Sequence, residues 1–181
     1  MAEISYNGVR IKRHRGYLLG ITRYGVAGVT LFALTGLWVF RGPLLHENFH
    51  TVIPNEVYRS SQLSPEVLER RIRELSLRSV INLRTNENTT SRFKGEQEVT
   101  EVHGVDLHLI RLRVSMPPRG TLQQLVHLLN TVRRPLLLHC ERGVERSGIA
   151  SAVAVLLSGR NIAEARKQFG LTYGFVPLIC Q

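Results

Sequence analysis

Residues 139–148 constrain the fold of this 181-residue chain more than any other segment. They read H-C-E-R-G-V-E-R-S-G, they follow the apolar run 136–138, and they precede the apolar stretch 149–157. The first apolar run has the length of a buried strand and the second has the length of a helix. Cys140 is therefore expected at the carboxyl end of a strand, where open α/β sheets bind their ligands.

The spacing of Cys140 and Arg146 suits the binding of a phosphate dianion. The residues between them can curl so that their backbone N–H groups point at one centre, and the helix that opens near Ser147 adds the positive end of its dipole. Such a nest favours a thiolate, which is the nucleophilic form of cysteine. Arg146 can return its planar guanidinium to the same centre and bind two phosphate oxygens.

The other loop residues are expected to support this chemistry. Gly143 permits a backbone bend that a side chain would resist. The Ser147 hydroxyl is placed to donate a hydrogen bond to the sulfur and to ease its departure. His139 is expected to brace the loop through its ring nitrogens rather than to act as a base.

The loop resembles the signature loop of the cysteine-dependent protein-tyrosine and dual-specificity phosphatase superfamily. The resemblance runs from about Val52 to Pro177, and residues 57–64, 80–84 and 173–177 are similar to segments of the small atypical dual-specificity-like members of bacteria, fungi and plants. It implies that Cys140 is the nucleophile, Arg146 the phosphate clamp and Ser147 the partner of the thiolate. The expected phosphate-binding residues are Glu141, Arg142, Gly143, Val144, Glu145 and Arg146. A cysteine that only packs and a sulfurtransferase loop are the alternatives; packing does not require Gly143, Arg146 and Ser147 together.

The general acid of this superfamily has no obvious counterpart. Many members carry an aspartate on a mobile loop before the cysteine, but here no Asp or Glu occurs between Asp106 and Glu141, and Asp106 lies too early. Glu145 is the expected substitute, and the alternative is that it only pairs with Arg142 or another arginine. Without an acid the enzyme would favour aryl phosphates and would be slower by about 10²–10⁴ on alkyl phosphates.

The N-terminal part of the chain predicts a membrane anchor. Residues 25–40 carry no charge and are bounded by Arg23 and Arg41. Sixteen helical residues span about 24 Å, and flanking aromatic and arginine side chains extend the match to a hydrocarbon core of about 30 Å. We expect a basic segment at residues 1–24, an uncleaved transmembrane signal anchor at 25–41, a tether at 42–55 and a phosphatase domain at 56–181. A cleaved signal peptide and a buried soluble helix are the alternatives.

The charge distribution predicts the orientation of this anchor. The net charge is +10, and five Lys or Arg residues precede the apolar segment, whereas Arg41 stands almost alone after it. The positive-inside rule then places the N-terminus in the cytoplasm and the catalytic domain on the non-cytoplasmic side of a single-pass protein. The excess charge also suits an acidic substrate or an anionic membrane surface, although a solvated basic face explains it equally well. No nucleic-acid motif is present.

The alternation of strands and helices predicts an α/β fold, a mostly parallel central sheet flanked by helices, as in dual-specificity phosphatases. Strands are expected at residues 56–59, 79–83, 105–112 and 136–139. Helices are expected after the cap at Ser64 and at residues 93–103, 121–132, 149–157 and 162–169.

Two hypotheses of function follow. The first is a membrane-anchored phosphomonoesterase that acts on a phosphorylated protein, or on an acidic small-molecule or lipid phosphate, through a phosphocysteine at Cys140. The second is an inactive phosphate-binding module that tethers a phosphorylated partner. A lipid phosphatase also stays open. No cofactor and no metal ion is expected, and a regulatory disulfide between Cys140 and Cys180 is a minor alternative.

Overall fold

The computed structural model describes residues 25–36, 47–84, 91–114 and 117–176. Its strands form one five-stranded sheet in the order β1-β2-β5-β3-β4. The strands are β1 (His50–Ile53), β2 (Val57–Ser60), β3 (Ser79–Asn82), β4 (Asp106–Leu109) and β5 (Leu136–His139). Only the β1–β2 pairing is antiparallel, and the other three pairings are parallel. The predicted α/β class with a mostly parallel sheet is therefore confirmed.

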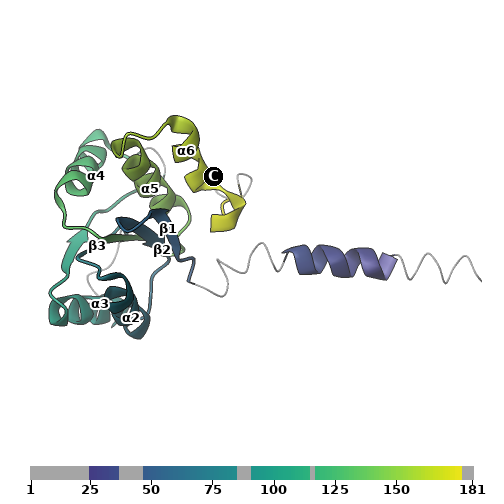
Figure 1. Cartoon of the computed structure of the whole chain (residues 1–181), viewed down its shortest axis with the longest axis horizontal. Coiled ribbons are helices and arrows are strands. Elements are labelled where there is room, and N and C mark those ends of the chain that lie inside the picture. Colours follow the sequence, from purple (N-terminus) through teal and green to yellow (C-terminus); the bar gives the residue numbers. More distant parts are fainter. Residues whose placement is uncertain (1–24, 37–46, 85–90, 115–116, 177–181) are drawn as a thin grey trace, which may run out of the picture. The chain divides into compact units, whose positions relative to one another are not determined.

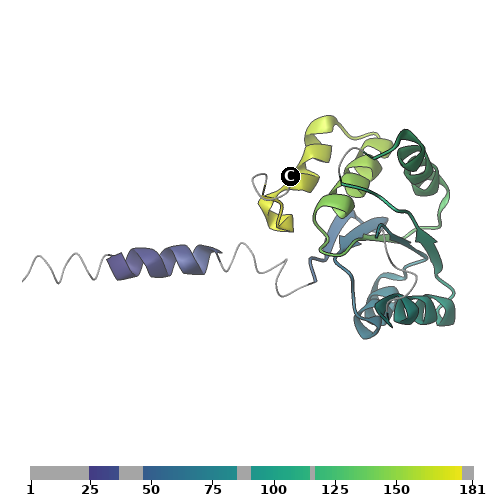
Figure 2. The same ribbon diagram turned by 180° about the vertical axis from the view of Figure 1, so that it is seen from behind.

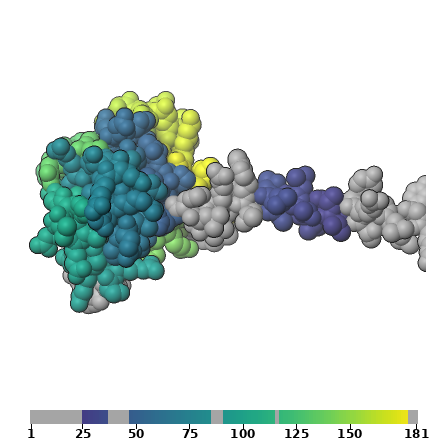
Figure 3. All heavy atoms as spheres, turned by 60° about the horizontal axis from the view of Figure 1, so that its bottom comes forward, coloured from purple at the N-terminus to yellow at the C-terminus, as the bar shows by residue number. Residues whose placement is uncertain are grey.

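Helices cover both faces of the sheet, as Figures 1 and 2 show from opposite sides. One layer consists of α2 (Pro65–Leu75) and α3 (Ser91–Val102), and Figure 3 views the domain from the side of this layer. The other consists of α4 (Arg119–Thr131), α5 (Glu145–Leu157) and the short α6 (Ile162–Arg166), with 3-10 turns at Lys167–Phe169 and Leu171–Tyr173. Parallel strands need such crossover helices, which explains why neither face is open to solvent.

Alternate residues of the central strand reach the two helical layers. Leu136 and Leu138 belong to the core on the α4 and α5 side, whereas Leu137 belongs to the core on the α2 and α3 side. All three side chains are fully buried, as the period of two in a strand requires for a strand covered on both faces. This packing fixes β5 in the middle of the sheet and thereby fixes the position of the residue that follows it.

Local sequence explains most element boundaries. Ser64 caps α2, with its hydroxyl accepting from the Val67 N–H, and Pro65 occupies the first helical position. Gly104, at a φ of 63°, follows the helix that it was expected to end. The strand expected at 105–112 is shorter, ending at Leu109, although Ile110 and Leu112 remain buried. The helix expected at 162–169 becomes a single α-turn followed by a 3-10 turn.

Part of the predicted tether belongs to the sheet. His50–Ile53 forms β1 and pairs antiparallel with β2, and Val52 and Ile53 are buried. The run Thr51-Val52-Ile53 is β-branched throughout, which favours a strand, but it is too short to show a clear alternation in the sequence. The folded part of the chain therefore begins before residue 56.

The described part of the predicted anchor is a helix at residues 25–36. Its apolar side chains are exposed, with Phe32 at 82% and Val29 at 71%. Among the described residues, no helix has both the length and the apolar character needed to cross a bilayer. Residues 37–41 of the predicted span and residues 1–24 lie outside the described residues.

Candidate active site

The candidate site forms where three parallel strands end at the same level. The register places Ser60 of β2 and Asn82 of β3 on either side of His139, the last residue of β5. Cys140 follows directly and is only 1% exposed. The helix α5 then begins at Glu145, so the predicted strand, loop and helix are all present.

The loop between Cys140 and α5 is held from outside by its main-chain oxygens. The Glu141 carbonyl accepts from the Gln62 N–H at 3.2 Å, and the Arg142 carbonyl accepts from the Asn48 side-chain amide at 3.0 Å. The carbonyls of the next two residues, Gly143 and Val144, both accept from Nη2 of Arg59, at 2.7 and 2.9 Å. Four consecutive carbonyls therefore point away from the centre of the loop.

The orientation of these carbonyls fixes the orientation of the N–H groups. In a planar trans peptide the N–H of one residue points opposite to the carbonyl of the residue before it. The N–H groups of residues 142–145 therefore point to the inner side of the loop. The Gly143 N–H does so visibly, because it donates to the Cys140 sulfur at 3.2 Å. The loop therefore has the backbone arrangement of an anion nest, and anion binding by it stays a prediction.

The start of α5 adds to the nest. Val144 is the N-cap residue of α5, and its side chain has no oxygen that could accept a hydrogen bond. The first N–H groups of the helix therefore lack the side-chain acceptor that an N-cap residue usually provides. The positive end of the helix dipole lies at the same place. Both features favour a bound anion next to Cys140.

Gly143 is required by both its backbone angle and its surroundings. Its φ is 72°, in the left-handed region, and a Cβ atom there would lie 2.6 Å from the Ser61 backbone nitrogen. It would also lie 2.7 Å from the carbonyl carbon of Ser60, the last residue of β2, and this backbone cannot move aside without disturbing the sheet. The glycine expected from the motif therefore lets the loop pass against the end of β2.

Arg59 is a fully buried cation behind the loop. Besides the two loop carbonyls, it donates from Nη1 to the main-chain oxygen of Gln168 at 2.8 Å. Its guanidinium also stacks over the Tyr173 ring at 4.1 Å from the centroid. Burial lowers the pKa of Arg59 to about 10, with the interactions with Tyr173 and Cys140 opposing the shift. Arg59 is therefore still charged at neutral pH.

Asn48 is the second residue that holds the loop. Its buried side-chain amide donates to the carbonyls of both Arg142 and Tyr173, each at 3.0 Å. Its oxygen lies 2.9 Å from Nε2 of His50, which fixes the orientation of the amide. Burial, and then the charge of Arg59, lower the pKa of His50, so the ring is neutral and can donate one N–H.

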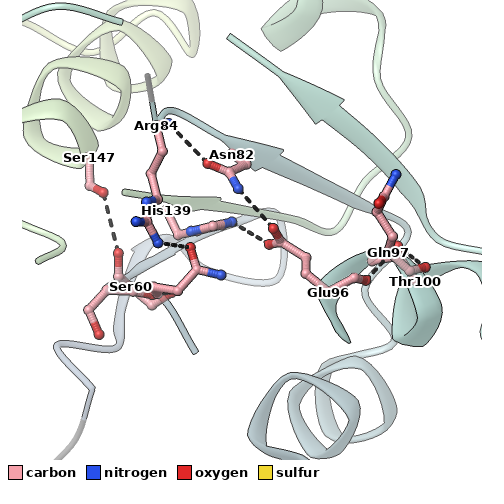
Figure 4. Close-up of polar contacts among 10 residues, drawn as sticks. Ser60, Asn82, Arg84, Glu96, Gln97, Thr100, His139 and Ser147 are labelled. Atoms are coloured by element: carbon pink, nitrogen blue, oxygen red, sulfur yellow. Dashed lines mark hydrogen bonds and ion pairs between the residues drawn. The ribbon is translucent and has the colours of Figure 1, made fainter. Parts of the chain in front are cut away.

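His139 contacts a carboxylate on the other side of the sheet, as Figure 4 shows. Its Nε2 lies 2.5 Å from Oε1 of Glu96, on α3, and both side chains are almost fully buried. The second oxygen of Glu96 accepts from Asn82 at 2.8 Å. Burial alone would raise the pKa of the Glu96 carboxyl, but the His139 charge and hydrogen bonds from His139, Asn82 and Gln62 lower it. His139 thus braces the end of β5 through Glu96 rather than through the loop.

The acidic residues of the loop make different contacts. Glu141 forms an ion pair with Arg84, which follows β3. Glu145 is 15% exposed, and its carboxylate lies 4.0 Å from the guanidinium of Arg142, which is 76% exposed. Glu145 is the first residue of α5, and the alternative pairing with Arg142 is present, while its role as a proton donor stays a prediction.

Arg146 and Ser147 lie in the first turn of α5. Among the described residues, none forms an ion pair or a hydrogen bond with the Arg146 guanidinium, which leaves it able to bind an anion. The Ser147 hydroxyl does not contact the sulfur in this structure, because it donates to the Ser60 carbonyl at 3.3 Å. A hydroxyl has one proton, so the predicted bond to sulfur would require its rotation.

Sequence reasoning missed the supporting residues Asn48, Arg59 and Glu96. Asn48 lies in the segment interpreted as a tether, and Glu96 lies on a helix with many charges, so neither stands out. Arg59 carried a signal, because it lies within a predicted strand next to apolar residues. A cation in a strand covered on both faces must bind internal acceptors.

Comparison with known proteins shows the family and the fold of this chain. A sequence model of the tyrosine phosphatase family matches residues 43–171. Among curated proteins, none matches the chain significantly. The core catalytic domain of the PP-IP phosphatase Siw14 from S. cerevisiae is 22% identical, with a TM-score of 0.59, and the match covers 74% of this chain and 81% of that one. TpbA from P. aeruginosa, solved in complex with pTyr, is 13% identical with a TM-score of 0.56, over 71% of this chain and 76% of that one. These two likenesses show the fold.

Proposed function

This chain belongs to the tyrosine phosphatase family of cysteine-dependent phosphatases, and we propose that it hydrolyses phosphate monoesters through a phosphocysteine intermediate on Cys140. One observation carries the proposal: the carbonyls of residues 141–144 are bound from outside the loop, so the N–H groups of residues 142–145 point inward, and that of Gly143 donates to the Cys140 sulfur. An arrangement of this kind stabilises both a thiolate and the charged oxygens of a transferring phosphoryl group.

The reaction has two steps. The Cys140 thiolate attacks phosphorus, the ester P–O bond breaks, and its electron pair leaves with the ester oxygen, which takes up a proton. Water then attacks the phosphocysteine, the S–P bond breaks, and inorganic phosphate and the thiolate are released. Arg146 and the loop N–H groups bind the phosphoryl oxygens in both steps.

Substitution of the nucleophile tests the mechanism. Cys140→Ser should abolish turnover of an aryl phosphate while the protein still binds tungstate, because the nest and Arg146 survive the change. Arg146→Lys should reduce both, since an ammonium cannot bind two oxygens in one plane. Turnover near wild type in Cys140→Ser would overturn the phosphocysteine mechanism.

We further propose that aryl phosphates, such as phosphotyrosine in proteins, are the preferred substrate class. The support is the lack of any Asp or Glu between Asp106 and Glu141, since aryl leaving groups depart with little protonation. TpbA was solved with pTyr, whereas Siw14 is described as a PP-IP phosphatase, so a panel should include aryl, lipid and inositol phosphates. Preference for an alkyl or inositol phosphate would contradict this assignment.

Glu145 is the proposed proton donor for poorer leaving groups. Its place in the first turn of α5, directly before Arg146, supports this role, while its proximity to Arg142 supports a purely structural one. If it donates a proton, Glu145→Gln should slow alkyl phosphates far more than aryl phosphates. Arg142→Gln is the matched control, because it removes the ion pair but keeps the carboxylate. Equal losses on both substrates in Glu145→Gln would assign it a structural role only.

We also propose that the N-terminal segment anchors the enzyme in a membrane, with the catalytic domain on the non-cytoplasmic side. The uncharged run of residues 25–40, its exposed apolar side chains at 25–35 and the basic residues before it support this proposal. A reporter fused after Gln181 should be active only outside the cytoplasm. Recovery of the full chain in the soluble fraction would remove the anchor, and a cytoplasmic reporter would reverse the orientation.

A further inference from the structure

Two side chains outside the loop account for the direction of its N–H groups. Arg59 binds the carbonyls of Gly143 and Val144, and Asn48 binds the carbonyl of Arg142. Each of these carbonyls belongs to the same peptide group as an N–H that points inward. If a carbonyl lost its donor, its peptide could rotate, and the N–H would leave the nest.

The two side chains are themselves held by the C-terminal segment. Tyr173 supplies the ring beneath Arg59 and the carbonyl that accepts from Asn48, and Gln168 supplies another acceptor for Arg59. Asn48, Arg59 and the segment containing Gln168 and Tyr173 are distant in sequence but meet behind one loop. Arg59 and Asn48 are therefore fixed before any anion binds.

We propose that Arg59 and Asn48 are positioning residues that preorganise the phosphate loop for anion binding, through the carbonyls of residues 142–144. This inference rests on the proposed function of the loop. It goes further in assigning the direction of the N–H groups to residues that touch neither the sulfur nor the substrate. Arg59 binds the carbonyls of Gly143 and Val144 through one nitrogen and so holds both of these peptide groups at once. Asn48 holds the preceding peptide group through the Arg142 carbonyl.

Tungstate affinity of the full-length chain in a Cys140→Ser background tests the proposal without turnover. Arg59→Met keeps much of the side-chain length but removes every donor, and should weaken tungstate binding by about tenfold or more, since misplacement by about 1 Å can cost 10²-fold in such sites. Arg59→Lys keeps the charge and one donor group, and should recover part of the affinity. Calorimetry gives the binding constants, and far-UV circular dichroism verifies folding.

Arg71→Met is the matched control for this substitution. Arg71 also stacks on a ring, that of Phe49 at 4.4 Å, but its ion pair is with Glu74 on α2 and not with the loop. The control should bind tungstate within about twofold of Cys140→Ser, because no loop carbonyl loses a donor.

A second pair keeps the proposal testable if Arg59→Met fails to fold. Asn48 and Asn55 both have a positive φ, 50° and 61°, so glycine suits both backbones. Asn48→Gly should weaken tungstate binding severalfold, whereas Asn55→Gly, in the exposed turn after β1, should not. The inference would be overturned if Arg59→Met or Asn48→Gly, in the Cys140→Ser background, folded and bound tungstate with the same affinity as Cys140→Ser alone. Turnover by Cys140→Ser would instead overturn the phosphocysteine mechanism and leave these affinities meaningful.

Discussion

The pair formed by Glu96 and His139 gives the sharpest test of how the end of β5 is held. In Glu96→Gln the carboxylate loses its charge and one of its two acceptor oxygens. The remaining oxygen can accept a hydrogen bond from His139 or from Asn82, but not from both. The new amide NH2 group then faces the other of these two donors. One buried donor is then unsatisfied, and the buried contact between the His139 ring and a carboxylate oxygen loses its negative partner.

The structure sets the size of this effect. An unsatisfied buried donor costs about 1–3 kcal/mol, and removing one partner of a buried ion pair costs about 3–5 kcal/mol. Because one hydrogen bond survives in Glu96→Gln, we expect a loss of about 3 kcal/mol in the free energy of unfolding. With an m-value of about 2 kcal/mol/M, the urea midpoint falls by about 1.5 M. Glu98→Gln, at an exposed position of the same helix, is the control and should change stability by less than about 0.5 kcal/mol.

A compensating substitution makes the reasoning specific. Asn82→Asp provides two acceptor oxygens, one for the Arg84 N–H that Asn82 already binds and one for the new amide of Glu96→Gln. The double variant should recover at least half of the lost stability in urea unfolding followed by far-UV circular dichroism at pH 7. A loss below about 0.5 kcal/mol in Glu96→Gln would refute the assigned pairing. A double variant that is less stable than Glu96→Gln would refute the proposed exchange of donor and acceptor.

Three further outcomes are expected. Folding lowers the pKa of Glu96, so the stabilising contribution of this carboxylate is complete above its ordinary pKa of 4.5. The contribution is lost as the pH falls through the lower pKa of the folded state. The stability advantage of wild type over Glu96→Gln should therefore shrink in acid titrations below pH 4.5. Gly143→Ala places a Cβ against the Ser61 nitrogen at a positive φ. It should lower the free energy of unfolding, measured in urea, by more than the roughly 1–2 kcal/mol that a left-handed residue costs alone. It should also reduce tungstate affinity measured by calorimetry. Ser147→Ala removes a buried hydrogen bond to Ser60 and should cost about 1 kcal/mol in thermal unfolding, and an unchanged midpoint would contradict this account.

The sequence predicts the central strand and its loop well because several local signals agree there. The apolar run before His139 can only be buried, and the motif after it fixes the turn into α5. The predicted β5 matches the structure at both ends. By contrast, β1 is missed because four residues carry little periodic signal, and it becomes a strand only through pairing with β2.

The sequence makes the candidate site residues visible but not the residues that support them, for a physical reason. Cys140 and Arg146 lie within one short segment, so their spacing is visible in the sequence. Asn48, Arg59 and Glu96 reach the loop or His139 from three different elements, and only the folded sheet brings them together. The direction of the Ser147 hydroxyl likewise depends on a carbonyl at the end of a neighbouring strand.

The phosphate loop is secured through atoms that every amino acid possesses. The contacts that orient its peptide groups end on main-chain oxygens, so replacing a loop side chain other than Gly143 does not delete the acceptor. Side chains such as Arg142, which is largely exposed, can therefore change during evolution or in the laboratory while the backbone keeps its shape. The shape of the loop backbone and the chemistry of its exposed side chains can therefore be changed independently. Substitutions at the exposed loop positions are a way to redirect the enzyme to other phosphate esters.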